Sequence, residues 1–190
     1  MNRSSLILCC CALILVILGC GGSDNSSTAN KPAASPTAST SSGKTSQDYL
    51  TEGSVAYKAK DYKTAITAYE KALDLEKKDQ KLEKKWWFVL IDNLTLAYGI
   101  SGDNKNARAT AEYGISKDPT YPFFYYNLAC TYGEDGDEDN AIKNLTLAYQ
   151  YKANILPGEH MPDAATDDSF KKFHDSAKFK KAVADLKAAK

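Results

Sequence analysis

Alanine residues recur at a fixed interval in this chain, and that interval restricts the possible folds more than any other feature. Ala107 and Ala141 lie 34 residues apart, and Ala65 precedes Ala107 by 42 residues, which is 34 plus an insertion of eight. A period of this length is typical of arrays in which short units stack on their neighbours and share one continuous core. The sequence therefore predicts a stack of three similar units.

Each unit carries small and aromatic residues at corresponding places. The first unit, about 46–79, contains Gly53, Ala65, Tyr69, Ala72 and Leu73; the second, about 88–121, contains Leu94, Tyr98, Gly102, Ala107 and Pro119; the third, about 122–155, contains Leu128, Ala129, Tyr132, Gly136, Ala141 and Ala148. This pattern closely resembles the tetratricopeptide repeat. The resemblance implies an all-α, right-handed solenoid of three antiparallel helix pairs over 47–155, followed by C-terminal capping helices in 156–190.

Small residues and turn residues explain why the pattern folds this way. Ala129 on a first helix and Ala141 on a second helix are small because the two helices should cross closely there. Gly102-Asp103 and Gly136-Asp137 fall between the paired helices, where glycine takes a left-handed turn and aspartate caps the next helix. Lys60-Asp61 is the weaker equivalent in the first unit.

The eight-residue insertion, Gln80 to Trp87, precedes the second unit. Its Lys- and Glu-rich stretch favours a helix, so we expect one long helix from about 80 to 101. Adjacent side chains cannot share one face of a helix. We therefore expect one of Trp86 and Trp87 to pack on the first unit and the other to be partly exposed, the alternative being a hot spot for a partner.

Residues 156–190 are suited to closing the open end of the stack. Pro157-Gly158 and Pro162 interrupt the helical pattern, and Phe179, Val183 and Leu186 then form one stripe of a final helix. The opposite face of that helix is rich in lysine. A solvated cap is the expected role, and binding to an anionic membrane is the alternative.

The first 19 residues have the features of an export signal. Leu6 to Leu18 is a run of 13 uncharged residues, a length that suits a signal peptide better than a membrane span. The run ends in Ile17-Leu18-Gly19-Cys20, which resembles the lipobox of bacterial lipoproteins. The resemblance implies cleavage before Cys20 and lipid attachment to its thiol. The alternatives are an ordinary signal peptide and a membrane anchor with chance cysteines.

Residues 20–46 form the lipidated cysteine and a disordered tether. The stretch 21–46 contains no aromatic or branched aliphatic residue, so little in it can offset the entropy lost on ordering. By resemblance to lipoprotein sorting signals, Gly21 favours the outer membrane, with the folded part on its periplasmic face. Cys130 is the one cysteine left after processing and lipidation, so no internal disulfide is expected.

Several kinds of chemistry are not expected. Lys and Arg together number 24, as do Asp and Glu, a balance that argues against general nucleic-acid binding. The acidic run that begins at Glu134 fails the spacing of a calcium loop, because Asn140 stands where glycine is needed. With two histidines and no nucleophile or phosphate-loop motif, we expect no enzyme, no cofactor and no metal.

The resemblance to tetratricopeptide repeats also implies a function. In that family the first helices line a concave groove that binds a peptide or helix of a partner. Facing the groove here would be Leu50, Tyr57, Asp92, Asn93, Leu96, Phe123, Tyr126 and Asn127. We expect a lipid-anchored scaffold that binds an envelope protein, possible roles including assembly of an envelope complex. The alternative is an accessory, non-catalytic subunit of an envelope enzyme or transporter.

Two of these groove residues occupy equivalent positions. Asn93 and Asn127 lie 34 residues apart, and an amide that both donates and accepts can hold a peptide backbone. Phe123 and Tyr126 would be apolar anchors. The alternative for the two asparagines is that they satisfy local backbone groups. The groove lacks the Lys and Arg of the carboxylate clamp found in chaperone-binding relatives.

The anchor can be tested at Cys20. We expect Cys20→Ala to block lipidation and to leave an unprocessed precursor, because the thiol that accepts the lipid is lost. Metabolic labelling with a fatty acid and fractionation of membranes measure this, with Cys130→Ala as the control. A Cys20→Ala chain that matures and fractionates like the parent would contradict the lipoprotein interpretation.

Overall fold

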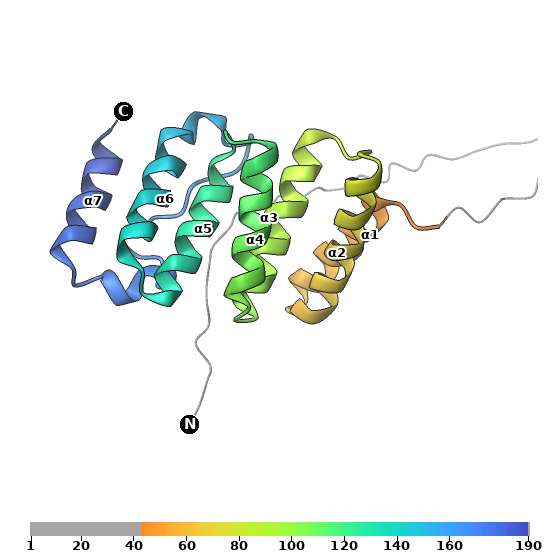
Figure 1. Cartoon of the computed structure of the whole chain (residues 1–190), viewed down its shortest axis with the longest axis horizontal. Helices are drawn as coiled ribbons and strands as arrows, with labels where there is room; N and C mark the ends of the chain where they lie inside the picture. The colour runs from red at the N-terminus through yellow and green to blue at the C-terminus, as the bar shows by residue number, and fades with distance from the viewer. Residues whose placement is uncertain (1–42, 190) are drawn as a thin grey trace, which may run out of the picture.

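The computed structural model describes residues 43–189, and the regular elements of that range are all helical (Figure 1). Three consecutive helix pairs and a final helix make up the stack: α1 (Ser46–Lys58) with α2 (Tyr62–Lys78), α3 (Lys84–Ile100) with α4 (Asn104–Lys117), α5 (Pro122–Asp135) with α6 (Glu138–Gln150), and α7 (Ala177–Ala188). Two short 3-10 helices, η1 (Lys152–Asn154) and η2 (Asp168–Phe173), lie between α6 and α7. The expected all-α solenoid of three helix pairs with a C-terminal cap is confirmed.

The helices form two layers. Within the first layer, α3 packs directly against both α1 and α5. The second helices pack on the first: α2 lies against α1 and α3, and α4 lies against α3 and α5. We call the face formed by α1, α3 and α5 the inner face. It corresponds to the surface that the sequence predicts as the groove.

The turns within the helix pairs share one design, as predicted. Gly102 and Gly136 have φ angles of 81° and 85°, and Lys60 takes the equivalent position in the first pair with a φ of 61°. An aspartate follows in each case, and its side chain accepts a hydrogen bond from a backbone N–H of the next helix at 3.1 Å. These aspartates are Asp61, Asp103 and Asp137. The left-handed residue thus ends one helix and the aspartate begins the next.

The expected helix from about 80 to 101 is wrong at its start, because α3 begins at Lys84. The carboxylate of Glu76 accepts hydrogen bonds from the backbone N–H groups of Lys81 and Leu82 at 3.1 to 3.2 Å. The Leu82 side chain is buried, with 8% of its surface exposed. This side-chain contact holds the start of the insertion out of a helix and overrides its helix propensity.

Trp86 and Trp87 differ in exposure as predicted: Trp87 is buried and Trp86 is half-buried. The Trp87 ring lies 6.2 Å from the ring of Tyr113 on α4 and 5.9 Å from that of Phe124 on α5, measured between centroids. Its aromatic partners therefore come from the second and third pairs, while Trp87 also lies beside Glu76 and Lys77 of α2.

The small residues at the helix crossings are fully buried. Ala65, Ala107 and Ala141 have no exposed surface. A Cβ atom at Gly53 would come within 2.5 Å of the Tyr69 ring on α2. The close contact at Gly53 is thus made by Tyr69, one turn beyond Ala65.

The C-terminal residues cover the last helix pair. Phe179 and Val183 of α7 are buried, and α7 packs on α6, at the left of Figure 1. Phe170 and Phe173 lie on η2, which packs on α5. The cap therefore contains one α-helix and one 3-10 helix.

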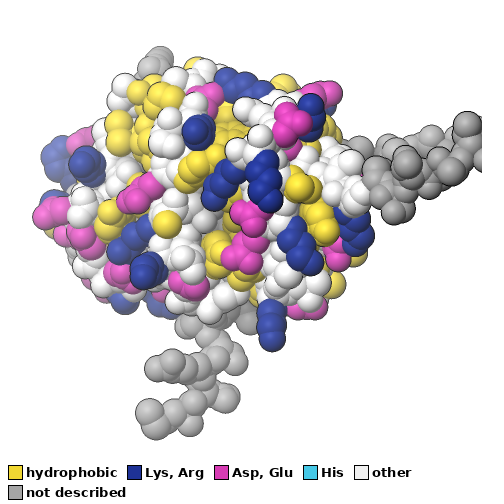
Figure 2. All heavy atoms as spheres, turned by 45° about the vertical axis from the view of Figure 1, so that its right-hand side comes forward, with side chains coloured by type: hydrophobic (Ala, Val, Ile, Leu, Met, Phe, Trp, Pro, Cys, Tyr) yellow, Lys and Arg dark blue, Asp and Glu magenta, His cyan; other side chains and the backbone are white. Residues whose placement is uncertain are grey.

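Charged side chains of both signs are spread over the outside of the molecule. On the face shown in Figure 2, Lys and Arg side chains alternate with Asp and Glu. An ion pair also links the cap to the stack, because Lys178 of α7 lies 3.9 Å from the Glu138 carboxylate of α6. The surface thus follows the balanced composition of the chain.

The crossing of α5 and α6 can be tested by overpacking. We expect Ala141→Leu to lower the free energy of unfolding by about 1–3 kcal/mol, because the added atoms have no space between the helices. Thermal or urea unfolding measures this. Ala184→Leu makes the same change at an exposed position of α7 and should have little effect. Equal stability of the two variants would contradict the close crossing at Ala141.

Candidate functional site

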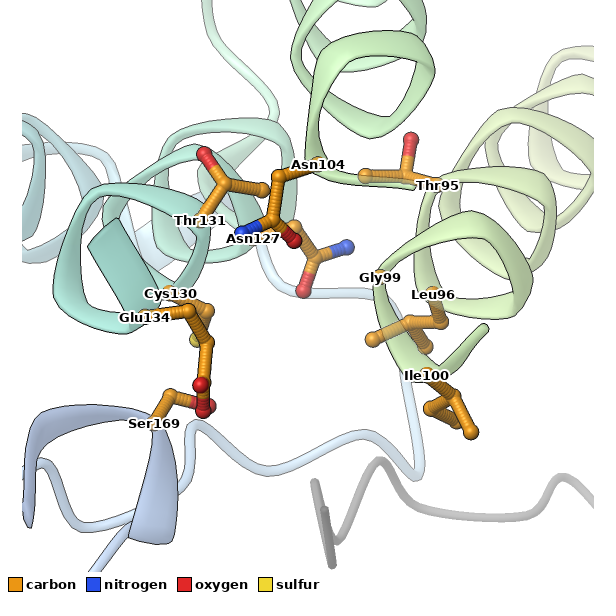
Figure 3. Close-up of a pocket in the computed structure, with 10 residues that line it drawn as sticks. All are labelled: Thr95, Leu96, Gly99, Ile100, Asn104, Asn127, Cys130, Thr131, Glu134 and Ser169. Atoms are coloured by element: carbon orange, nitrogen blue, oxygen red, sulfur yellow. The ribbon is translucent and has the colours of Figure 1, made fainter. Parts of the chain in front are cut away.

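A pocket opens on the inner face between α3 and α5 (Figure 3). Its cavity volume is about 30 Å³. Four helical elements line it: Thr95, Leu96, Gly99 and Ile100 of α3, Asn104 of α4, Asn127, Cys130, Thr131 and Glu134 of α5, and Ser169 of η2. Helical periodicity explains the set, since residues three, four and seven places apart share one face of a helix.

Arg108 of α4 fixes the far end of α5 beside this pocket. Its Nε donates to Thr131 Oγ1 and its terminal nitrogen donates to the Thr131 carbonyl oxygen, both at 3.1 Å. The same guanidinium pairs with Asp135 and lies over the Tyr132 ring, 4.5 Å from its centroid. A guanidinium with several fixed donors is rigid, so Arg108 positions the end of α5 that carries Glu134.

Asn127 is buried at the wall of the pocket, with 2% of its surface exposed. Its Nδ2 donates to Asp92 Oδ1 of α3 at 2.5 Å. Its Oδ1 is buried and has no hydrogen-bond partner. Figure 3 shows this amide pointing into the space between α3 and α5.

Glu134 provides a second acceptor. Its Oε1 is buried without a hydrogen-bond partner, and its carboxylate lies next to Ser169 in Figure 3. Burial raises the pKa of the Glu134 carboxyl, while Lys171 and Lys172 oppose this by attraction. Glu134 is also the penultimate residue of α5, where the helix dipole disfavours a negative charge.

The segment after α6 runs along α5. Glu159 accepts a hydrogen bond from the Tyr121 hydroxyl at 2.9 Å, and Asp167 accepts one from the Tyr126 hydroxyl, also at 2.9 Å. Further along, the backbone of Ser169 lies against Gly133. A Cβ atom added at Gly133 would clash with the carbonyl oxygen of Ser169. We call residues 155–173 the tail segment. It covers the side of α5 that would otherwise be open.

The residues predicted to line the groove are largely buried, which corrects the expectation of an open surface. Buried among the eight are Leu50, Asp92, Leu96, Phe123, Tyr126 and Asn127, while Tyr57 and Asn93 are half-buried. Their binding of a partner stays a prediction. Leu96 and Asn127 line the pocket together, and Asp92 contacts it through Asn127.

The other predicted groove residues lie elsewhere. Tyr126, expected as an apolar anchor, is fully buried beneath the tail segment, with its ring edge-on to Phe170. Leu50 and Phe123 belong to the core. Tyr57 packs edge-on against Tyr62, with ring centroids 5.5 Å apart. These side chains pack within the stack and stabilise it.

Asn93 and Asn127 differ in their contacts although they occupy equivalent positions. Asn93 lies within hydrogen-bonding reach of the Tyr69 hydroxyl, a contact that opposes the rise of the Tyr69 pKa to about 12 caused by burial. Asn127 instead donates to a carboxylate. Neither contact is the local backbone bond considered as the alternative.

Sequence reasoning missed Glu134, Arg108 and Gly99 as residues of this site or its support. Glu134 was assigned only to an acidic turn. A usable signal existed, because Glu134 follows Asn127 by seven residues and therefore shares its helix face.

Some predicted features fall outside these observations. Cys20 and the export signal lie outside the described residues. Within residues 43–189, no helix is long and apolar enough to cross a membrane. The same range contains no cluster of three or more His, Cys, Asp or Glu side chains arranged to hold a metal ion.

Family models match two parts of the chain. One tetratricopeptide repeat model matches residues 49–79, and a second matches residues 110–143. The first match covers most of α1 and α2, and the second spans α5 with parts of α4 and α6. These two segments of the chain thus match tetratricopeptide repeats. Such repeats mediate interactions between proteins, and neither match indicates a catalytic family.

Solved structures show the same fold. The chain is similar to the Sgt2 tetratricopeptide domain from Aspergillus fumigatus, with 21% identity and a TM-score of 0.51 over 75% of this chain and 77% of that one. It is also similar to the C-terminal tetratricopeptide-containing domain of a putative FK506-binding protein from Plasmodium falciparum. There the identity is 20% and the TM-score 0.51, over 76% and 90% of the two chains. A comparison with curated proteins found no match.

The unpaired carboxylate at the pocket predicts a pH-dependent stability. Because burial raises the Glu134 pKa above its ordinary value of 4.5, ionisation of this group costs stability as the pH rises from 4.5 through the shifted pKa. We expect Glu134→Gln to raise the melting temperature near pH 7. The gain should disappear well below pH 4.5, where Glu134 of the parent is protonated in both the folded and the unfolded state. Calorimetry across this range measures it. An equal effect of Glu134→Gln at both ends of the range would contradict the proposed cause.

Proposed function

We propose that this chain is a lipid-anchored scaffold of the bacterial cell envelope, on the periplasmic face of the outer membrane, and that it binds a partner protein across its inner face. The lipobox-like stretch at Cys20 and the polar tether behind it support the anchor and the location. The repeats support a protein ligand. Assembly of an envelope complex is the role that we favour.

The observation that carries the binding role is the pocket between α3 and α5. Its buried acceptor atoms on Asn127 and Glu134 have no hydrogen-bond partners within the described chain. Buried polar groups are nearly always satisfied in folded proteins, so these atoms are available to a water molecule or to a donor group of a ligand. The pocket lies on the face that tetratricopeptide repeats use for peptides.

The tail segment limits where a partner docks. Its contacts with Tyr121, Tyr126 and Gly133 cover α5 along most of its length. Gly99 and Ile100 of α3 remain half-exposed at the other side of the pocket. A partner segment therefore lies across α3 and the mouth of the pocket.

Gly99 gives a sharp test, because a Cβ atom there meets nothing within 4 Å and its backbone is ordinary helix. We expect Gly99→Trp to fill the mouth of the pocket without disturbing the fold and to abolish capture of the partner. Crosslinking in native membranes, followed by purification and mass spectrometry, measures capture against the parent chain.

Lys143→Trp places the same side chain at an exposed position of α6 and is the matched control. Circular dichroism and melting temperature establish that both variants fold. If Gly99→Trp folds and captures the same proteins in the same amounts as Lys143→Trp, the inner face is not the binding surface.

A further inference from the structure

The pocket between α3 and α5 has a defined hydrogen-bonding character, which indicates what kind of group it binds. This inference rests on the proposed function in taking the inner face as the docking surface. The two buried atoms without partners, Asn127 Oδ1 and Glu134 Oε1, are both acceptors. An occupant must therefore donate hydrogen bonds.

The orientation of the Asn127 amide is fixed by its neighbour. Its Nδ2 donates to the Asp92 carboxylate at 2.5 Å. A flipped amide would bring two acceptor oxygens together, because a carboxylate accepts hydrogen bonds and donates none. The oxygen of Asn127 is thus the atom that faces the pocket.

Three hydrogen-bond donors around the pocket are engaged elsewhere. The Thr95 hydroxyl donates to the Ile91 carbonyl oxygen at 2.8 Å, and the Thr131 hydroxyl donates to that of Leu128 at the same distance. The Asn104 amide donates to Asp135 at 2.8 Å. Satisfying Asn127 and Glu134 from these groups would break existing hydrogen bonds.

Lysines approach Glu134 without supplying the missing donor. Lys172 Nζ donates to the backbone carbonyl oxygen of Glu134, and both Lys171 and Lys172 lower the pKa of its side chain by attraction. Glu134 Oε1 still has no donor. A half-buried carboxylate with an open acceptor position favours a cationic donor over a neutral one.

The size and walls of the cavity restrict that cation further. A volume of about 30 Å³ holds roughly two water-sized groups, since one such group needs about 10–15 Å³. A compact ammonium group fits this space better than a planar guanidinium does. Leu96, Ile100 and Cys130 supply apolar contacts at the same pocket, which suit a methylene stem.

We infer that the pocket binds a primary alkylammonium group, presented by a lysine side chain of the partner protein. The ammonium donates to Asn127 Oδ1 and Glu134 Oε1, and the methylenes lie against Leu96 and Ile100. A free aliphatic amine carries the same group and is the other source of this chemistry.

The test uses the full-length chain in a neutral detergent and n-butylammonium as the probe, followed by NMR of the backbone amides. We expect saturable shifts at Leu96, Gly99 and Asn127, and no such shifts with n-butanol, which has the same stem without the charge. Glu134→Gln should weaken binding of n-butylammonium at least about tenfold, because a charged hydrogen bond is lost.

Glu138→Gln is the matched control, because Glu138 also has a buried acceptor without a partner but lies on α6 near Lys178. Equal shifts with n-butanol, no binding of n-butylammonium, or full binding by Glu134→Gln would each overturn the inference. Two further probes distinguish a lysine of a partner protein from a free aliphatic amine. Tighter binding of acetyl-Gly-Lys-Gly-amide than of 1,5-diaminopentane supports a protein lysine. Tighter binding of 1,5-diaminopentane overturns the assignment to a protein lysine.

A failure of the amine-binding inference can be distinguished from a failure of the proposed scaffold function. If n-butylammonium does not bind but Gly99→Trp abolishes capture of the partner, the docking face stands and the lysine pocket fails. If n-butylammonium binds and capture is unchanged in Gly99→Trp, the pocket stands as an amine site and the scaffold role on this face fails.

Discussion

The close approach of the paired helices is the constraint on which the rest of the structure depends. Ala65, Ala107 and Ala141 are fully buried at successive crossings, and Tyr69 packs directly onto Gly53 where no side chain intervenes. With this spacing set, α2 and α4 each reach the first helix of the following pair, and two neighbouring apolar clusters fill the stack. The inner face, its pocket and the seat of the tail segment all follow from that arrangement.

The tail segment changes the meaning of the inner face. In an array ended only by a terminal helix, the side chains of α5 would be available to a ligand. Here, Tyr121 and Tyr126 donate hydrogen bonds to Glu159 and Asp167 of the same chain, so part of the face is already occupied. The tail segment reaches the pocket next to α3 on one side only, through Ser169. Asn127 Oδ1 and Glu134 Oε1 lack hydrogen-bond partners there, whereas the hydroxyls of Thr95 and Thr131 have theirs.

The sequence predicted the features that local or periodic patterns control, and it failed where side-chain contacts outside those patterns decide. The turns at Gly102 and Gly136 follow from residue types within a few positions. The start of α3 was missed because Glu76 binds the backbone of the insertion, a contact that helix propensity does not report. Tyr126 was expected to face a ligand because its partner Asp167, 41 residues away, carries no periodic signal.

The contacts between the tail segment and α5 also limit where further helix pairs can be added to the array. A duplicated helix pair inserted after α6 would separate Tyr126 from Asp167, and Gly133 from Ser169, unless the copy kept both contact residues. Duplication of the first or second pair leaves these contacts intact. The tail thus makes the third pair a fixed terminus, and growth of the array by repeat duplication is confined to the part of the chain before α5.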